Sequence, residues 1–187
     1  MAHPLHFESR AAFRQWLTQN ARSSEGVWLL FGKSSRLVTV KANEALEEAL
    51  CFSWIDGQMK RLDEHSYIKY FSERRKNSKW SQKNKALAQS LEKRGLMTEA
   101  GREKVLEAKQ NGQWAAATKP SAVSQQHIDQ LADLLQSNPL AHTNFLNMSP
   151  SVKKTYTRAY LDAKTDTGRA KRIAWITERL DKNLKPM

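Results

Sequence analysis

All segments that favour β-strands lie within the first 71 residues of the chain, and the remainder has helical periodicity. Four short runs rich in apolar and β-branched or aromatic residues occur at 27–31, 37–40, 54–62 and 67–71. From Ser78 onward the apolar residues recur at helical spacing. This distribution predicts an α+β fold, with a small, mainly antiparallel sheet and covering helices, followed by an all-helical C-terminal module.

The four runs are expected to form two β-hairpins. Gly32–Ser35 connects the first two runs and Asp63–Ser66 the second two, and both have the length and composition of hairpin loops. A helix is expected before the first hairpin, with Ser9 as its N-cap, and another between the hairpins, with Asn43 as its N-cap. The predicted order of the first half is therefore helix, hairpin, helix, hairpin.

The helical part is expected to contain a break. Residues 115–123 combine alanines with Lys-Pro-Ser and read as a linker. We therefore predict an α+β domain with two trailing helices over 1–114, a linker over 115–123 and a helical module over 124–187. The expected N-caps of the four helices in that module are Ser124, Asn138, Ser149 and Thr167.

Cysteine content and hydropathy indicate the cellular compartment in which the protein is expected. The single cysteine, Cys51, cannot form an internal disulfide and suits a reducing compartment. No apolar run approaches the length of a membrane span, and the N-terminus lacks the basic start and apolar core of a secretory signal. The sequence predicts a cytoplasmic protein without a transmembrane segment, and it leaves the oligomeric state open.

Positive charge is concentrated in two regions. The chain has 31 Lys and Arg against 19 Asp and Glu, a formal net charge of +12. Residues 1–59 are neutral, whereas 69–104 hold eleven bases and four acids and 150–187 hold ten bases and four acids. Clustered positive charge favours a polyanionic partner, of which nucleic acid is the first expectation and an acidic protein or an anionic lipid surface are alternatives. A well-solvated basic surface without such a partner also fits the composition.

The stretch 71–84 interleaves bases with aromatic residues and leads into a helix. Free backbone N–H groups at a helix start, together with nearby basic side chains, can bind an anion. We predict anion binding by basic residues of this stretch and of the C-terminal region: Arg74, Arg75, Lys76, Lys79, Lys83, Lys153, Lys154, Arg158, Arg169 and Arg172.

Asp56 has two interpretations that the sequence leaves open. It lies at the start of an expected strand, where alternation places Trp54, Asp56 and Gln58 on one face. In the first interpretation the carboxylate is structural, partly buried, and hydrogen-bonded to neighbouring backbone or paired with an arginine such as Arg74. In the second it belongs to a small-ligand or catalytic pocket whose candidate residues are Trp54, Asp56, Gln58, Trp80 and Asn84.

Known catalytic and metal-binding motifs are missing from the sequence. The five histidines show no metal-ligand spacing, and one cysteine cannot build a structural zinc site. A phosphate-binding glycine loop and a nucleophile elbow are also missing. Cys51 lies in an apolar helical stretch and is expected to be a buried, inert thiol. The sequence therefore predicts no cofactor, no metal and no enzymatic activity.

An ordered series of motifs runs along nearly the whole chain. The motifs are 44–57, Phe71, Arg74-Arg75, 78–84, 95–101, Ala108-Lys109, 112–114, Asn138-Pro139, Phe145, 149–151, Tyr156, Ala163-Lys164 and 169–173. With these motifs the chain resembles the YdeI/OmpD-associated family, also called the bacteriocin-protection family. That resemblance implies a role in bacterial tolerance of bacteriocins and cationic antimicrobial peptides, and brings no agreed catalytic residues.

Three functions follow as hypotheses. The first is a non-enzymatic cytoplasmic protein of stress tolerance that binds an anionic partner through 69–104 and 150–187. The second is a ligand-binding protein or enzyme with a pocket around Trp54, Asp56 and Gln58. The third is an adaptor whose helical module docks a protein.

Overall fold

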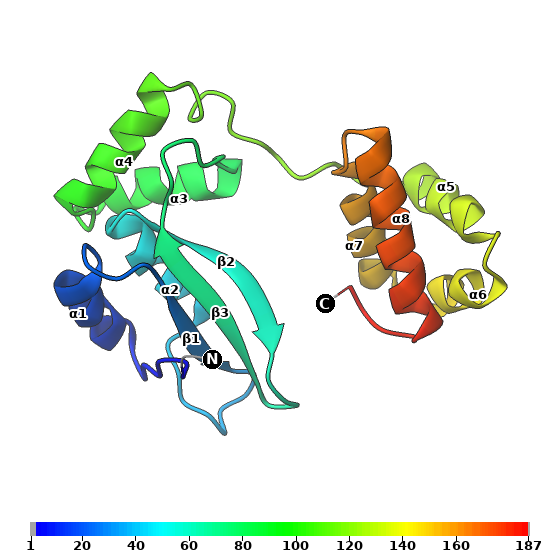
Figure 1. Cartoon of the computed structure of the whole chain (residues 1–187), viewed down its shortest axis with the longest axis horizontal. Coiled ribbons are helices and arrows are strands. Elements are labelled where there is room, and N and C mark those ends of the chain that lie inside the picture. Colours follow the sequence, from blue (N-terminus) through cyan, green and yellow to red (C-terminus); the bar gives the residue numbers. More distant parts are fainter. Residues whose placement is uncertain (1–2, 187) are drawn as a thin grey trace. The chain divides into compact units, whose positions relative to one another are not determined.

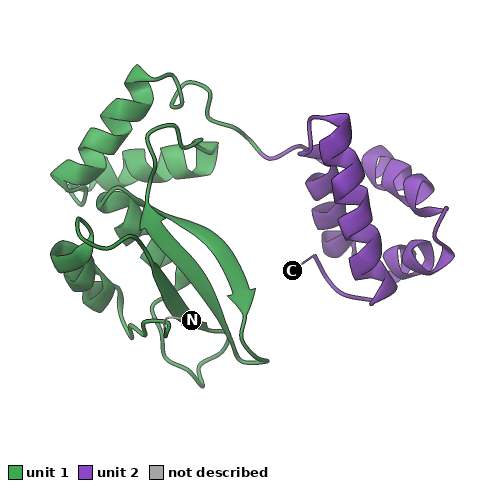
Figure 2. Cartoon of the chain, viewed as in Figure 1, with its two compact units in different colours: residues 1–119 green, residues 120–187 purple. Residues whose placement is uncertain are grey.

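The computed structural model describes residues 3–186, and over this range the chain forms three strands and eight helices (Figure 1). The chain divides into two compact units between Lys119 and Pro120 (Figure 2). We call residues 1–119 unit 1 and residues 120–187 unit 2. The predicted α+β fold with a helical C-terminal part is confirmed. The domain limits given above stay a prediction.

The sheet of unit 1 is antiparallel and has the order β1-β3-β2. Its strands are β1 (Val27–Gly32), β2 (Trp54–Arg61) and β3 (Ser66–Glu73). The predicted hairpin between β2 and β3 forms around Asp63, whose carboxylate accepts hydrogen bonds from the backbone N–H groups of His65 and Ser66, both at 2.7 Å. These hydrogen bonds to the charged form, the Ser66 hydroxyl first among them, lower the pKa of Asp63.

The predicted hairpin formed by 27–31 and 37–40 is wrong. Residues 37–40 are not a strand, and the outer edge of β1 is paired with Leu5 instead. The Leu5 N–H donates to the Trp28 carbonyl at 2.8 Å, and the Leu30 N–H donates to the Leu5 carbonyl at 2.9 Å. With this edge occupied, the segment after β1 forms a loop, and Val40 at its end is buried in the core.

Strand β2 does not alternate regularly. Asp56 pairs with Phe71 and Met59 pairs with Lys69, so two residues of β2, Gly57 and Gln58, lie opposite one residue of β3. This is the geometry of a β-bulge, which bends a strand and changes the direction of its side chains. The prediction that alternation carries through Trp54, Asp56 and Gln58 is therefore wrong beyond Asp56.

Four helices belong to unit 1: α1 (Arg10–Asn20), α2 (Ala42–Cys51), α3 (Gln82–Lys93) and α4 (Glu99–Gln110). The side chains of Ser9, Ser81 and Thr98 cap α1, α3 and α4 by accepting a backbone N–H. One predicted start is corrected. Helix α2 begins after Lys41 instead of Asn43, with the Glu44 carboxylate accepting the Lys41 N–H. Helix α3 begins after Ser81, a few residues into the region of helical spacing that starts at Ser78.

Helices α1 and α2 pack on one face of the sheet. Their buried residues Phe13, Leu17, Ala45 and Ala49 form a core with the sheet residues Leu29, Phe31, Trp54 and Phe71. In Figure 1, α2 lies behind the strands. A second cluster joins the other side of α2 to α3 and α4 and contains Leu50, Leu91, Trp80 and Trp114. The first cluster fixes the sheet on α1 and α2, and the second fixes α3 and α4 on α2.

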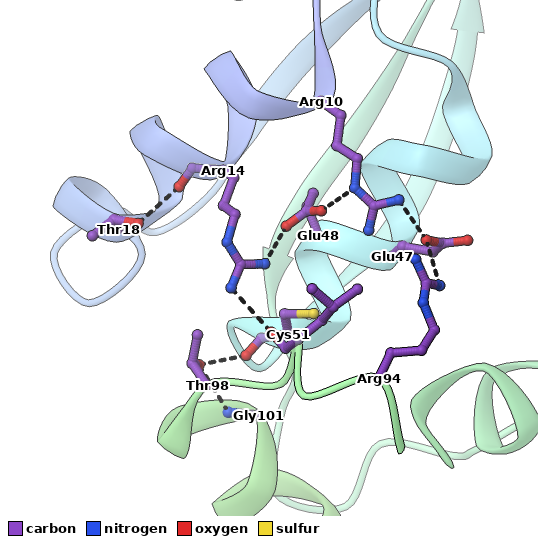
Figure 3. Close-up of polar contacts among 10 residues, drawn as sticks. Arg10, Arg14, Thr18, Glu47, Glu48, Cys51, Arg94, Thr98 and Gly101 are labelled. Atoms are coloured by element: carbon purple, nitrogen blue, oxygen red, sulfur yellow. Dashed lines mark hydrogen bonds and ion pairs between the residues drawn. The ribbon is translucent and has the colours of Figure 1, made fainter. Parts of the chain in front are cut away.

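A buried ion network ties α1 to α2 (Figure 3). The Glu48 side chain is only 2% exposed and pairs with Arg10 and with Arg14, the latter at 2.6 Å. Arg10 also pairs with Glu47 at 2.7 Å. The network continues to the start of α4, because the other Arg14 terminal nitrogen donates to the Leu96 carbonyl at 3.0 Å.

Helix α4 begins very close to the end of α2 (Figure 3). The Thr98 N–H donates to the Cys51 carbonyl at 3.2 Å, and the Thr98 hydroxyl accepts the Gly101 N–H. A Cβ atom at Gly101 would stand 2.4 Å from the Cys51 carbonyl oxygen, so only glycine allows this approach.

Unit 2 consists of α5 (Gln125–Leu135), α6 (Pro139–Asn147), α7 (Pro150–Leu161) and α8 (Asp166–Asp181). Ser124, Asn138 and Ser149 are the N-caps of the first three, as predicted, but α8 is capped by Thr165 instead of Thr167. Leu131, Phe145, Tyr156 and Ile176 are fully buried in the core of this unit. None of the helices in the described part of the chain is long and apolar enough to cross a membrane.

Candidate functional site

The loop between β3 and α3 is built around a buried arginine. Arg74 is 2% exposed, and its guanidinium carbon lies 4.0 Å from the centroid of the Trp80 ring. One terminal nitrogen donates to the Ser78 hydroxyl at 3.1 Å and to the Lys79 carbonyl at 3.0 Å. Burial lowers the pKa of this guanidinium to about 10, while the charge of Asp56 acts in the opposite direction. Arg74 therefore holds the loop from inside.

The other basic residues of this loop point to solvent. Arg75, Lys76, Lys79 and Lys83 are exposed, and none of them forms an ion pair with a residue in the described range 3–186. By contrast, Arg10, Arg14 and Arg102 are neutralised by glutamates. The loop and the first turn of α3 thus form a patch of uncompensated positive charge, which we call the basic loop (Arg75, Lys76, Lys79 and Lys83).

The basic loop borders the sheet face that α1 and α2 leave uncovered. This face carries Trp28 and Leu30 from β1, Lys60 from β2, and Ile68 and Tyr70 from β3, and we call it the open face. The Trp28 and Tyr70 rings lie 5.3 Å apart, and both residues are half-buried. A hollow of about 630 Å³ lies beside them, bordered by Ile55, Gln58, Arg75 and Asn77.

The open face was not predicted from the sequence. The run 27–31 was interpreted as a short apolar strand, without assigning its residues to two faces. A signal was present, because Trp28 and Leu30 alternate with Leu29 and Phe31, and Tyr70 alternates with Phe71. The strand order that brings Trp28 opposite Tyr70 was not available, since β1 pairs with β3 and not with 37–40.

The five candidate pocket residues lie in different surroundings. Trp54 is fully buried against α1 and donates from its indole nitrogen to the Ala21 carbonyl at 3.0 Å. Trp80 is buried against Trp114, with ring centroids 4.9 Å apart, and Asn84 is half-buried on α3. Only Gln58 borders the hollow described above.

Asp56 is partly buried and paired with a cation from the neighbouring strand. Its partner is Lys69 of β3, and the two side chains are 22% and 19% exposed. The expected arginine partner, Arg74, forms no ion pair with it, and acts on it only through the longer-range charge interaction. The carboxylate thus links β2 to β3.

In unit 2 the predicted anion-binding residues are distributed over α7 and α8. Lys154, Arg169 and Arg172 are exposed, and Lys153 and Arg158 are half-buried. Arg158 donates to the Ser121 carbonyl at 3.2 Å and Arg169 to the Ala163 carbonyl at 3.2 Å, so both are partly engaged by backbone. The Arg172 guanidinium lies 5.1 Å from the Trp175 ring centroid. The assignment of these residues to anion binding stays a prediction.

The Cys51 thiol and the possible metal ligands remain to be placed. The Cys51 thiol is fully buried, and burial raises its pKa, with Glu48 adding to the effect. A raised pKa disfavours the thiolate that a nucleophile needs. Residues 3–186 contain no group of three or more His, Cys, Asp or Glu side chains placed to hold a metal ion.

Two protein families match the chain, one within unit 1 and the other within unit 2. Residues 5–104 match the family described as a domain of unknown function (DUF8412). Residues 128–183 match the family described as "Bacteriocin-protection, YdeI or OmpD-Associated". The resemblance drawn from the sequence motifs is thus confirmed for the C-terminal segment. The comparisons with curated proteins and with solved structures gave no match.

Proposed function

The chain belongs to the family defined by the domain of unknown function (DUF8412), whose match spans more than half of it, and we propose that it is a non-enzymatic, cytoplasmic nucleic-acid-binding protein. The observation that carries this proposal is the basic loop. Four exposed bases lie in this loop and the first turn of α3 without an acidic partner among the described residues, and one of them, Arg75, borders the hollow beside the half-buried aromatic rings of the open face.

Charge is used differently elsewhere in unit 1. The arginines of α1 and α4 are paired with glutamates and serve to join helices. Uncompensated bases on one surface leave a field that attracts a polyanion and is neutralised only when that partner binds. The exposed bases Lys154, Arg169 and Arg172 of unit 2 supply a second basic region, which supports binding to an extended partner.

The match of residues 128–183 to a bacteriocin-protection family supports a role in bacterial tolerance of toxic peptides. We propose that unit 2 and unit 1 contribute to this role through the same polyanionic partner. An acidic protein is the alternative partner, and nuclease treatment of a lysate before capture on the full-length protein separates the two.

Salt dependence tests the binding proposal. If the four bases of the basic loop contact phosphates, affinity for a single-stranded oligonucleotide falls by about 50-fold between about 50 and 200 mM salt, because bound counterions are released on association. Fluorescence anisotropy with the full-length protein measures this loss. An affinity that is independent of salt, or no binding at low salt, would overturn the proposal.

A pair of charge reversals locates the contact. Arg75→Glu combined with Lys76→Glu is expected to weaken binding strongly and to reduce the salt dependence. Lys182→Glu combined with Lys185→Glu is the matched control, since Lys182 is already paired with Glu178 at 2.8 Å and both lysines follow helix α8, outside the basic loop. Equal losses in the two double variants would argue for a diffuse charge effect instead of a site.

A further inference from the structure

The open face carries two half-buried aromatic rings, whereas the equally half-buried Tyr67 of β3 stacks on Phe31 and packs against the core. Trp28 and Tyr70 are half-buried, with their planes at 53° and their centroids 5.3 Å apart. Phe31, Trp54 and Phe71, which belong to the core on the other side of the sheet, are at most 1% exposed. Large aromatic rings left at a sheet surface provide flat apolar platforms on which nucleic-acid bases stack.

A lysine covers one of these rings. The Lys60 ammonium lies 4.7 Å from the centroid of the Trp28 ring, and Lys60 is exposed. At an exposed site a cation is held only weakly over an aromatic face, so it is easily displaced. A base that stacks on Trp28 would take the place of this ammonium, which could then pair with the phosphate of the same nucleotide.

The hollow beside the rings offers groups that suit a nucleotide. The bulge in β2 places Gln58 at its border, and Asn77 reaches it from the basic loop, so two exposed side-chain amides face the same space. Amides can donate to and accept from base edges at once. Arg75, also at the border, supplies a positive charge for a phosphate, whereas the single carboxylate there, Glu73, lies 4.0 Å from the Lys104 ammonium.

From these contacts we infer that the open face binds single-stranded nucleic acid, with one base on Trp28, the next on Tyr70, and the connecting phosphates on Lys60 and Arg75. The inference rests on the nucleic-acid binding proposed above and specifies its substrate. In a duplex the base faces are already stacked on one another, so rings at a protein surface cannot reach them.

The test compares three ligands of equal length on the full-length protein by fluorescence anisotropy: oligouridine, the abasic sugar–phosphate chain, and a duplex. Oligouridine is expected to bind at least about 10-fold more tightly than the abasic chain, because each stacked base adds to the phosphate contacts. A parallel titration with oligodeoxythymidine shows whether the protein distinguishes ribose from deoxyribose.

Two variants remove the platforms while keeping apolar side chains. Trp28→Leu and Tyr70→Leu are each expected to weaken oligouridine binding by about 10-fold and to leave binding of the abasic chain unchanged. Trp175→Leu is the matched control, since Trp175 is a half-buried tryptophan of unit 2 that also lies beside arginines. Circular dichroism of each variant reports whether it is folded.

The outcomes separate the two proposals. If none of the three ligands binds to the wild-type protein, the nucleic-acid proposal itself fails. If all three ligands bind equally to the wild-type protein, phosphate binding stands and base stacking on the open face is refuted, and this comparison needs no variant. Equal losses for Trp28→Leu and Trp175→Leu would also refute it. Tighter binding of the duplex would assign the surface to double-stranded nucleic acid and overturn the inference.

Discussion

Replacing Glu48 with alanine is expected to lower the free energy of unfolding by about 3 kcal/mol, among the largest effects of any single substitution in unit 1. The Glu48 carboxylate is 2% exposed and pairs with two arginines that are themselves about one-third exposed. Removing it leaves Arg14 without its glutamate partner in a partly buried site. Arg10 keeps Glu47, which places the expected loss at the lower end of the range for buried pairs.

Urea unfolding of the variant and of a matched control measures this effect. The control is Glu92→Ala, which removes a carboxylate from an arginine pair whose side chains are 44% and 50% exposed. Such an exposed pair contributes about 1 kcal/mol or less. A Glu48→Ala protein as stable as the Glu92→Ala protein would show that the network in Figure 3 does not hold α1 on α2.

Replacing Arg74 with alanine is expected to cost about 3 kcal/mol of stability. The variant loses two hydrogen bonds from a charged donor, each of which contributes about 1.5–3 kcal/mol. It also loses a desolvated cation–π contact that contributes about 2 kcal/mol. Part of this loss is offset, because an incompletely compensated buried charge is removed as well. The Lys79 carbonyl is left without its side-chain donor.

Arg75→Ala is the matched control for Arg74, one position along the chain and of the same residue type. Arg75 is exposed, so its removal should change stability by no more than about 0.5 kcal/mol while weakening oligonucleotide binding. Thermal melts and anisotropy titrations of both variants separate the two roles. An Arg74→Ala protein that melts with the parent would contradict the internal role of that guanidinium.

The local features of the fold were accessible from the sequence. Ser9, Ser124 and Asn138 were identified as helix starts because a side-chain oxygen at an N-cap satisfies a free backbone N–H, an interaction confined to one turn. The hairpin of β2 and β3 was identified for the same reason, since Asp63 organises its own turn. The family resemblance added the C-terminal assignment.

Long-range pairing was not accessible. Leu37–Val40 has the composition of a strand, but the edge of β1 that it would occupy is taken by Leu5, far away in the sequence. Composition also did not reveal which member of the Arg74-Arg75 pair is buried, because that depends on the position of Trp80. The open face depended on both the strand order and the bulge at Gly57-Gln58, so its two aromatic rings could not be brought together beforehand.

We expect single-stranded nucleic acid to lie on the open face next to the basic loop. Photocrosslinking of 5-iodouridine-substituted oligouridine to the full-length protein, followed by mass spectrometry of the peptides, tests this most directly. Cross-links are expected at Trp28 and Tyr70, and they should disappear in high salt. Cross-links confined to Trp175 and the rest of unit 2, with none on β1 or β3, would contradict it.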